Sequence, residues 1–360
     1  MASFASKACS FSYRCKVLLR HSSNNNKIWL SHAIRTCSTA GGRAVLPEPY
    51  RSAEKIDIEK LFISRKVQSF LRKLTGFDLE KIYAPVQTHL NVPRYEFLTD
   101  EQLEKKFEEA RMKAHRKLQM PPVLRERRPC EEVLAKDPEI QGHDSSSFVF
   151  TDISYGYPDR ERIIAVREPN GLLRTANWEE RERMLQSYFT SKDRSFYMPK
   201  MFEPQHLRNV LDKQWYGFVL DRACIQFEPD HPDYIRVTHA CYDHIDAQRK
   251  FHDLRSTRHF GPMVFYLVIV RKVDNLLIDM MQRELIEDAA DLVRLFYHIH
   301  PRSDGVEVDE RADGVELVKM FTQSDSNKRA HLELAMQTYL EVKSSKDEMT
   351  KGLAAARGLQ

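Results

Sequence analysis

Apolar residues at helical spacing mark the first folded stretch of the chain. They recur at intervals of three and four residues, as on one face of a helix: Val67, Phe70, Leu71 and Leu74. A second helix is predicted to begin at Thr99-Asp100-Glu101-Gln102, which has the sequence of a capping box. It should end before Pro121-Pro122, because proline interrupts a helix. We therefore expect residues 46–144 to form an extended N-terminal region with two helices and linkers.

The pattern changes to that of β-structure after residue 145. Phe148-Val149-Phe150 and Ile163-Ile164-Ala165-Val166 are rich in aromatic and β-branched residues, so a hairpin is the simplest interpretation. Pro169-Asn170-Gly171 has the composition of a turn, and Leu172-Leu173 adds a short strand after it.

A helix is predicted to follow these strands. Asn177 can cap its start, and Trp178 is its first residue. Because a tryptophan ring is large and mostly apolar, we expect Trp178 to be buried between the strands and the helical half. Residues 145–190 thus form a β-hairpin plus helix.

The C-terminal half is predicted to be mainly helical. The expected helices are 204–212, 216–226, 234–247, 276–297, 315–322 and 327–342. The longest apolar run, Pro262 to Val270, fits a buried strand or helix and is too short to span a bilayer. Residues 191–344 are therefore expected to be mostly helical, and the polar, Lys-rich residues 345–360 to form a mobile tail.

These patterns together predict an α+β fold that is mainly α. It has N-terminal helices, a small β-hairpin or meander with a packed helix, and a helical C-terminal half.

The N-terminus has a distinctive charge pattern. No acidic residue precedes Glu48, whereas seven Lys and Arg residues lie there among Ser, Ala, Cys and Leu, a composition typical of a mitochondrial transit peptide. Arg35-Thr36-Cys37-Ser38 resembles a processing site with an arginine shortly before the cut. Residues 1–45 are therefore predicted to be removed. The alternative is a basic arm that binds nucleic acid directly.

Removal of this segment changes the charge of the protein. The whole chain has a formal net charge of +4, so the loss of seven basic residues leaves a nearly neutral remainder. Proteins that wrap nucleic acid unaided usually carry a strong basic excess, so contact with RNA should be local and contact with DNA is not expected. Other proteins are the partners that this composition favours.

Cysteine, histidine and carboxylate spacing gives no convincing metal site. No Cys-x-x-Cys pair exists, and His239, Cys241 and His244 lack a second half-site. Four carboxylates recur at helical spacing: Glu284, Glu287, Asp288 and Asp291. The pair of Glu-x-x-His motifs that carboxylate metal sites need does not accompany them, so a solvated acidic face is favoured.

Sequence signatures of catalysis are also missing. The chain has no G-x-x-x-x-G-K-[ST], no G-x-G-x-x-G and no G-x-S-x-G. We therefore predict that the protein is not an enzyme, with no catalytic residue, no metal and no cofactor.

Two basic clusters are candidate contacts with RNA or with partner proteins. Their residues are Arg125, Arg127, Arg128, Arg255, Arg258, His259 and Phe260. The second cluster combines forked donors with a ring that can stack, which suits RNA phosphates and splayed bases. The alternative is an internal network that ties helices to acidic neighbours such as Asp253, and the residues alone leave both open.

Several of these segments carry a family resemblance. They are Met120–Leu124, Phe148–Ser154, Arg160–Arg162, Val166–Pro169, Trp178–Arg181, Phe227–Asp230, Leu254–Arg258 and Leu277–Asp279. In order and spacing they resemble the family of mitochondrial small-subunit ribosomal protein twenty-two, over roughly residues 65–342. The chain departs from the family pattern at Pro262, where the family has a second glycine after Gly261.

The resemblance implies a structural component of the mitochondrial small ribosomal subunit, lying on its lower body, with no known catalytic site. We therefore expect a protein of the mitochondrial matrix that supports assembly and stability of this subunit and hence mitochondrial translation. Its partners would be other small-subunit proteins, with limited contact to rRNA and no membrane insertion. The alternatives are a matrix RNA-binding or assembly factor that is absent from the mature particle, and a metal enzyme built on Glu284 to Asp291.

Overall fold

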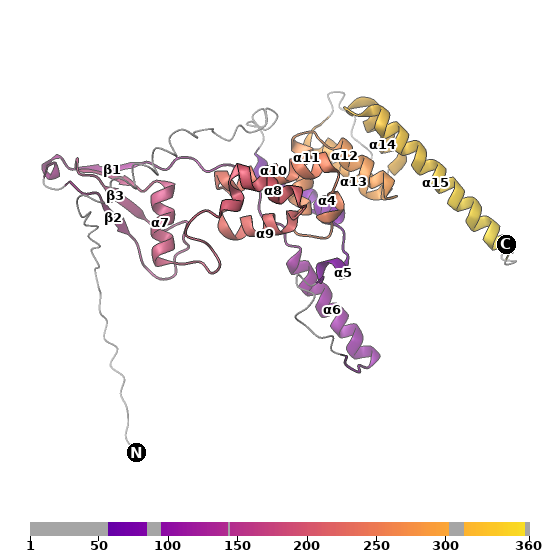
Figure 1. The fold of residues 1–360 in the computed structure, drawn as a ribbon, viewed down its shortest axis with the longest axis horizontal. Coiled ribbons are helices and arrows are strands. Elements are labelled where there is room, and N and C mark those ends of the chain that lie inside the picture. The colour runs from indigo at the N-terminus through magenta and orange to yellow at the C-terminus, as the bar shows by residue number, and fades with distance from the viewer. Residues whose placement is uncertain (1–56, 85–94, 143–144, 302–312, 357–360) are drawn as a thin grey trace, which may run out of the picture. The chain divides into compact units, whose positions relative to one another are not determined.

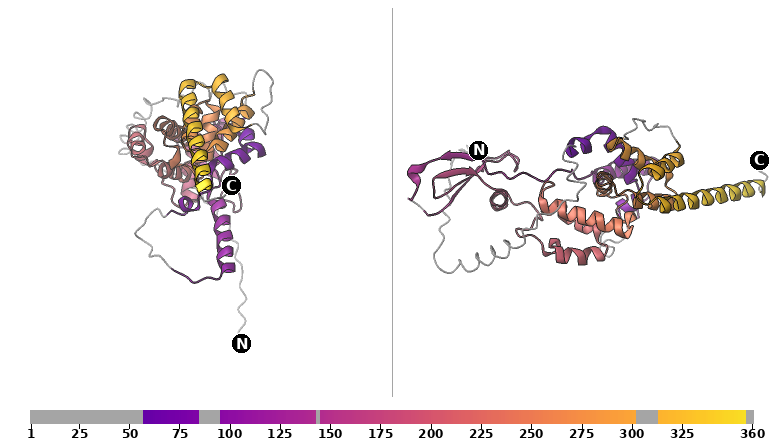
Figure 2. Two further views of the ribbon diagram at one scale, coloured as in Figure 1. Left: turned by 90° about the vertical axis from the view of Figure 1, so that its right-hand side faces the viewer. Right: turned by 90° about the horizontal axis from the view of Figure 1, so that it is seen from above.

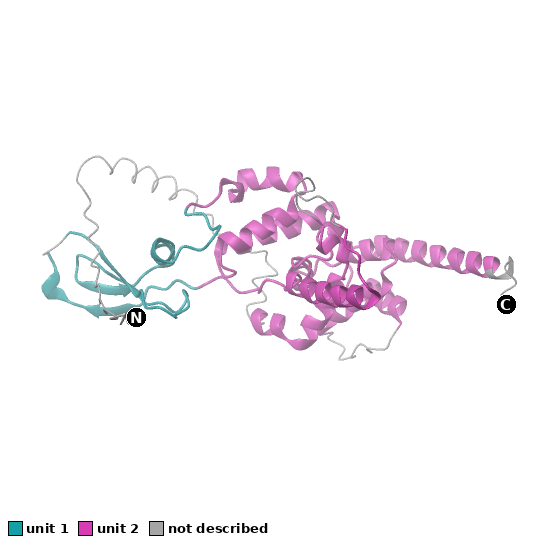
Figure 3. Cartoon of the chain, turned by 90° about the horizontal axis from the view of Figure 1, so that it is seen from below, with its two compact units in different colours: residues 1–43, 128–196 teal, residues 44–127, 197–360 magenta. Residues whose placement is uncertain are grey.

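The computed structural model describes residues 57–84, 95–142, 145–301 and 313–356 (Figure 1). The chain divides into two compact units, which are treated separately below (Figure 3). Within the described residues, the smaller unit comprises residues 128–196, and the larger unit comprises those up to 127 and from 197 onward. The predicted transit peptide, residues 1–45, lies outside the described residues.

The smaller unit is a four-stranded antiparallel sheet with one helix. Its elements are β1 (Val133–Lys136), the 3₁₀ turn η2 (Pro138–Ile140), β2 (Phe148–Thr151), β3 (Ile164–Arg167), β4 (Leu172–Thr175) and α7 (Trp178–Tyr188). The strand order is β1-β4-β3-β2. The three expected strands and the helix capped by Asn177 are confirmed, and β1 adds a strand that the sequence did not predict. Because β1 belongs to the sheet, the smaller unit begins at residue 128 and not at the expected residue 145.

The alternation of side chains along β3 places the core of the smaller unit. Ile164 and Val166 point to the same face, because side chains two residues apart in a strand share a side. Both are buried, and Met184 and Leu185 of α7 pack against them. The helix therefore covers one face of the sheet.

The turn between β3 and β4 requires glycine. Gly171 has a φ of +82°, and a Cβ at this position would collide with the carbonyl oxygen of Asp137. The Asp137 N–H donates to the Gly171 carbonyl oxygen at 2.9 Å, which joins the end of β1 to the turn. The predicted turn at Pro169-Asn170-Gly171 is confirmed.

The larger unit is helical in all its regular elements within the described ranges. Its helices are α3 (Ile58–Ile63), α4 (Arg65–Thr75), α5 (Leu79–Ile82), α6 (Asp100–Lys117), α8 (Pro204–Asp212), α9 (Tyr216–Gln226), α10 (Pro232–Gln248), α11 (Phe260–Ile269), α12 (Asp274–Gln282), α13 (Ile286–Ile299), α14 (Gly314–Ser324) and α15 (Arg329–Ala356), with 3₁₀ turns η3 (Lys200–Phe202) and η4 (Phe251–Asp253). The mainly α fold is confirmed. No helix among the described residues is long and apolar enough to cross a bilayer.

Helix α11 forms the centre of this unit. All ten of its residues are buried, and α4, α10 and α13 pack around it. The apolar run that fitted either a strand or a helix is therefore a core helix. The predicted capping box of Thr99 with Gln102 is also confirmed, and at the start of α4 the Ser64 hydroxyl accepts from the Val67 N–H.

In three described helices, a residue other than glycine in the left-handed conformation allows a hydrogen bond that closes the last turn. These residues are Arg249 after α10, Arg271 after α11 and Glu284 after α12, with φ between +54° and +61°. In each case the next N–H donates to the carbonyl five residues earlier at 2.9–3.1 Å, which closes the last turn sharply. The prediction of one continuous helix from Leu276 to Tyr297 is therefore wrong, because the chain breaks at Glu284.

Helix α15 continues well past its packing partners. Its buried residues, Leu332, Ala335 and Met336, lie in its first turns, where α12 and α14 pack against it. Every residue from 340 to 353 is exposed, and Figures 1 and 2 show this part extending away from the other helices of the larger unit. The prediction that this helix ends at Val342 is wrong.

Candidate RNA and protein contact surfaces

The segment that carries the second basic cluster is fixed on the end of α4. Ser256 has a φ of +62°, and its N–H donates to the Thr75 carbonyl oxygen at 2.8 Å. Its hydroxyl accepts from the Asp78 N–H at 3.3 Å. These hydrogen bonds hold the backbone from which Arg255 and Arg258 project.

Arg255 pairs with α13. Its Nη2 lies 2.5 Å from Asp288 Oδ2, and the two side chains are only 21% and 20% exposed. The guanidinium passes over Gly76, where a Cβ would lie 3.2 Å from Nε. Gly76 also has a φ of +73°, so a side chain is disfavoured there for two reasons.

Arg258 pairs with α9. Its Nε donates to Asp221 Oδ1 at 2.9 Å, its Nη2 contacts the same oxygen, and His259 Nε2 lies 2.9 Å from it. Burial raises the pKa of Asp221, but the hydrogen bond from His259 and the charge of Arg258 outweigh burial, so the pKa lies below its usual value. Asp221 is therefore ionised at neutral pH, and it holds the arginine in place.

His259 and Phe260 are buried, at 2% and 1% exposure. The interpretation from sequence gave this ring a role in stacking on a base, which requires an exposed face. The structure instead places Phe260 at the start of the core helix α11. Arg258, which is 37% exposed, is thus more accessible than Arg255, which is 21% exposed and pairs with Asp288.

The first basic cluster is anchored by its backbone. In the larger unit, the Arg125 N–H donates to the Glu59 carboxylate at 3.3 Å and the Arg127 N–H donates to the Asp230 carbonyl oxygen at 3.1 Å. Arg128 belongs to the smaller unit, where its carbonyl oxygen accepts from Trp178 Nε1 at 2.7 Å. The side chains of Arg125 and Arg128 are exposed.

Trp178 is only partly buried. The expectation of a fully buried ring is wrong, because the indole lies at the first turn of α7 and directs its N–H to the backbone of Arg128. Arg181, one turn later, lies over the ring with its Cζ 5.9 Å from the centroid.

The candidate metal ligands on α10 take part in packing and hydrogen bonds. His239 packs on Tyr266 with ring centroids 4.3 Å apart, and His244 Nδ1 lies 3.0 Å from the Tyr216 hydroxyl. Cys241 is buried, which raises the pKa of its thiol. Within the described ranges, no group of three or more His, Cys, Asp or Glu residues is placed to hold a metal ion.

The expected solvated face is confirmed for Glu284 and Glu287, which are exposed, but not for Asp288 and Asp291. Glu284 lies in the break after α12, where it pairs with Lys346 at 2.5 Å. Asp288 pairs with Arg255, and Asp291 pairs with Arg294 at 2.8 Å. Asp288 and Asp291 are largely buried, so these two carboxylates stabilise the helical packing.

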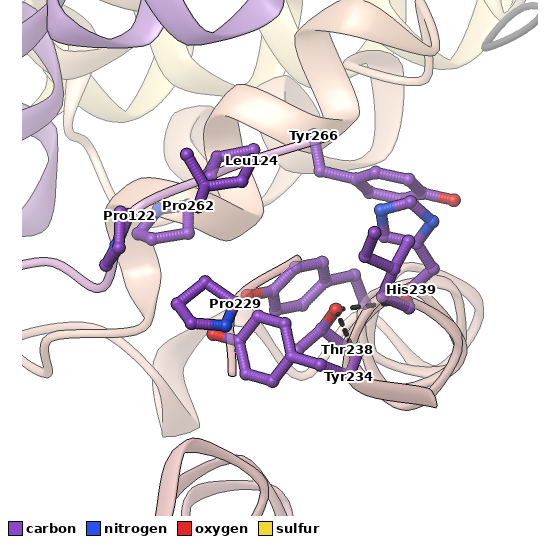
Figure 4. Close-up of a pocket in the computed structure, with 11 residues that line it drawn as sticks. Pro122, Leu124, Pro229, Tyr234, Thr238, His239, Pro262 and Tyr266 are labelled. Atoms are coloured by element: carbon purple, nitrogen blue, oxygen red, sulfur yellow. Dashed lines mark hydrogen bonds between the residues drawn. The ribbon is translucent and has the colours of Figure 1, made fainter. Parts of the chain in front are cut away.

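A small pocket lies where the segment after α6 crosses the core helices (Figure 4). Pro122 and Leu124 approach it from that segment, Tyr266 from α11, and Tyr234 and His239 from α10. Its volume of about 30 Å³ is on the scale of one or two water molecules. This site therefore joins the segment to the core and has no room for a larger ligand.

The fold defines a mainly helical protein with a small antiparallel sheet, in which Arg255 and Arg258 pair with carboxylates of neighbouring helices. The family described as Mitochondrial 28S ribosomal protein S22 matches residues 60–301, and the chain belongs to this family. The resemblance that the sequence segments indicated is confirmed.

Two relatives cover most of the chain. It is 43% identical to the small ribosomal subunit protein mS22 of Mus musculus over 286 residues, which are 79% of this chain and 80% of the relative. It is 44% identical to the small ribosomal subunit protein mS22 of Bos taurus over 282 residues, which are 78% of this chain and 79% of the relative.

Proposed function

We propose that this protein is a structural constituent of the mitochondrial small ribosomal subunit and supports its assembly and stability. The observation that carries the proposal is the 43% identity to a small-subunit ribosomal protein over 79% of the chain. The family match over residues 60–301 includes residues of both compact units, so the similarity is not confined to one shared module.

The surfaces support contacts mainly with neighbouring proteins and local contacts with rRNA. In the second cluster, Arg255 uses its guanidinium in an internal ion pair, whereas Arg258 is 37% exposed. In the first cluster, Arg125 and Arg128 have exposed side chains. A nearly neutral mature chain with a few exposed arginines favours a small number of phosphate contacts.

The expected location is the mitochondrial matrix, within the ribosome. Import would remove the basic N-terminal segment between about Thr36 and Val45, as its composition predicts. N-terminal sequencing of the protein from purified mitochondria tests this. A mature protein that retains Phe11 to Arg20 would instead support the basic-arm interpretation.

The central test is co-sedimentation with mature small subunits. We expect the tagged protein to migrate with these particles in a high-salt gradient, at one copy per particle by quantitative mass spectrometry. An assembly factor would appear on precursor particles and be absent from mature ones, and this result would contradict the proposal.

A further inference from the structure

We propose that Arg116, Lys117 and Arg258 form a binding site for the phosphate backbone of RNA at the C-terminal end of α6. The inference rests on the rRNA contact proposed above and assigns a place to it. These residues line an open pocket of about 540 Å³, a size within the usual range for ligand sites. The other lining residues are Gln119, Met120 and Pro122, so the lining carries three positive charges and no carboxylate.

Met120 fixes the two sides of this pocket relative to each other. Its Sδ occupies the space that a Cβ of Gly261 would need. Met120 can therefore approach the start of α11 this closely only because Gly261 has no side chain. Arg116 and Lys117 lie just before Met120, and Arg258 lies just before Gly261. The contact therefore brings basic residues from two distant segments to one pocket.

Lys117 is oriented before any ligand binds. Its Nζ lies 4.4 Å from the ring centroid of Tyr83 and 3.5 Å from the Ile82 carbonyl oxygen. The side chain nevertheless remains exposed, as does that of Arg116. Side-chain freedom that is already lost before binding lowers the entropic cost of holding a phosphate.

Arg258 retains donors that face solvent. Its Nε and Nη2 bind Asp221, whereas Nη1 makes no hydrogen bond to any part of the chain that the structure describes. The edge formed by Nη1 and Nη2 can therefore donate two parallel hydrogen bonds to a phosphate group. Asp221 keeps the guanidinium in a fixed orientation while this edge binds.

A simpler reading explains part of the pattern. Basic residues in the last turn of a helix interact favourably with the helix dipole, which accounts for Arg116 and Lys117 without a ligand. The ion pair with Asp221 accounts for the position of Arg258, but neither effect accounts for the remaining guanidinium edge of Arg258 that lines the same pocket. Binding of RNA phosphate explains all three.

The test compares two double variants of the full chain. Arg116→Gln with Lys117→Gln removes two charges from the pocket. Arg111→Gln with Lys113→Gln removes two charges from exposed positions of the same helix, outside the pocket lining. Binding of a fluorescent single-stranded oligouridylate is measured by anisotropy between about 50 and 200 mM salt, and circular dichroism verifies that both variants fold.

We expect the slope of log affinity against log salt to become shallower by about 1.4 for the pocket variant, or about 0.7 for each lost phosphate contact, and to change little for the control. Equal changes in both variants would overturn the proposal, because they would reflect general surface charge. A pocket-specific loss of polyglutamate binding with unchanged RNA binding would also overturn it, in favour of an acidic protein partner.

Sedimentation separates this inference from the proposed function. If the unmodified protein enters mature small subunits but the pocket variant binds RNA as the control does, the pocket assignment fails and the ribosomal function stands. If the unmodified protein does not enter them, the proposed function itself fails.

Discussion

Arg174 on β4 donates two parallel hydrogen bonds, each 2.9 Å, to the carboxylate of Glu180 on α7. Its Nε donates a third, also 2.9 Å, to Glu168. The hydrogen bonds from Arg174 lower the pKa of Glu180 below its usual value. Glu180 also accepts from the Asn177 N–H at 2.9 Å, so one carboxylate both caps the helix and joins it to the sheet.

Replacement of Arg174 by alanine should loosen the smaller unit. Arg174 is 17% exposed, and its loss leaves two partly buried carboxylates without their shared partner, at a cost of about 2–3 kcal/mol. Hydrogen exchange of peptides from residues 128–196 measures the loss. Arg183→Ala, at an exposed position of the same helix, is the control and should change exchange little. Equal effects in both variants would show that the bidentate contact adds nothing.

A double-mutant cycle on Arg255 and Asp288 should reveal a strong coupling. Both side chains are mostly buried, so removal of one partner leaves the other charge unpaired. We expect a coupling free energy of about 1–3 kcal/mol from denaturant unfolding. The exposed pair of Arg329 and Glu333 on α15 gives the comparison and should couple by about 0.5 kcal/mol. If Arg255→Ala leaves stability unchanged but lowers incorporation into the small subunit, Arg255 acts through RNA and not through the internal pair.

The unfolding free energy should fall in mild acid because of His239. Burial lowers its pKa to about 4, while the nearby charge of Asp243, which also pairs with Lys272, opposes this shift. The unfolded chain binds this proton near pH 6.5, so the contribution of the neutral ring is complete above pH 6.5 and is lost as the pH falls from 6.5 toward 4. The loss should reach up to about 3 kcal/mol.

The variant His239→Phe keeps an aromatic ring and removes the titration. Its thermal stability should decline less than that of the unmodified protein over this pH range. His331→Gln, on the exposed side of α15, should follow the unmodified protein. Parallel curves for all three proteins would show that His239 already binds its proton in the folded state.

Arg249→Gly should stabilise the larger unit. Arg249 has a φ of +54° and an exposed side chain, so glycine relieves backbone strain at little cost in contacts. The expected gain is about 0.5–1 kcal/mol in thermal unfolding, reduced by the greater freedom of glycine in the unfolded chain. Lys250→Gly, at the next position, provides the control and should give no gain. A loss of stability in Arg249→Gly would show that its side chain contributes contacts to the folded state.

Local sequence signals were sufficient to predict a helix where its first residues include a capping side chain or a proline. Pro204 at the first position of α8 and the capping boxes at Thr99 and Asn177 are such signals, and the helices lie where they indicated. The break at Glu284 had no such signal, because the usual glycine is absent and the apolar stripe continues across it. The break lets α12 and α13 pack against each other, which is a long-range contact that residue spacing does not reveal.

At the candidate site, too, the sequence identified individual residues but not their long-range partners. The sequence identified Arg255 and Arg258 as notable, but their carboxylate partners lie 33 and 37 residues away and could not be chosen from spacing. Burial of Phe260 and the exposed strand β1 were missed for a similar reason. Four exposed residues show no alternation, and β1 exists only through its pairing with β4.

The exposed part of α15 makes this helix a natural reporter of its surroundings. From residue 340 to residue 353 no side chain is buried, and a helical segment of that length is only marginally stable in water on its own propensity. Its amide protons should therefore exchange rapidly in the isolated protein, while those of the first turns, near Leu332, remain protected. Slow exchange of this one peptide inside a particle would mean that another surface covers it, so a label-free measurement on a single segment distinguishes free from assembled molecules.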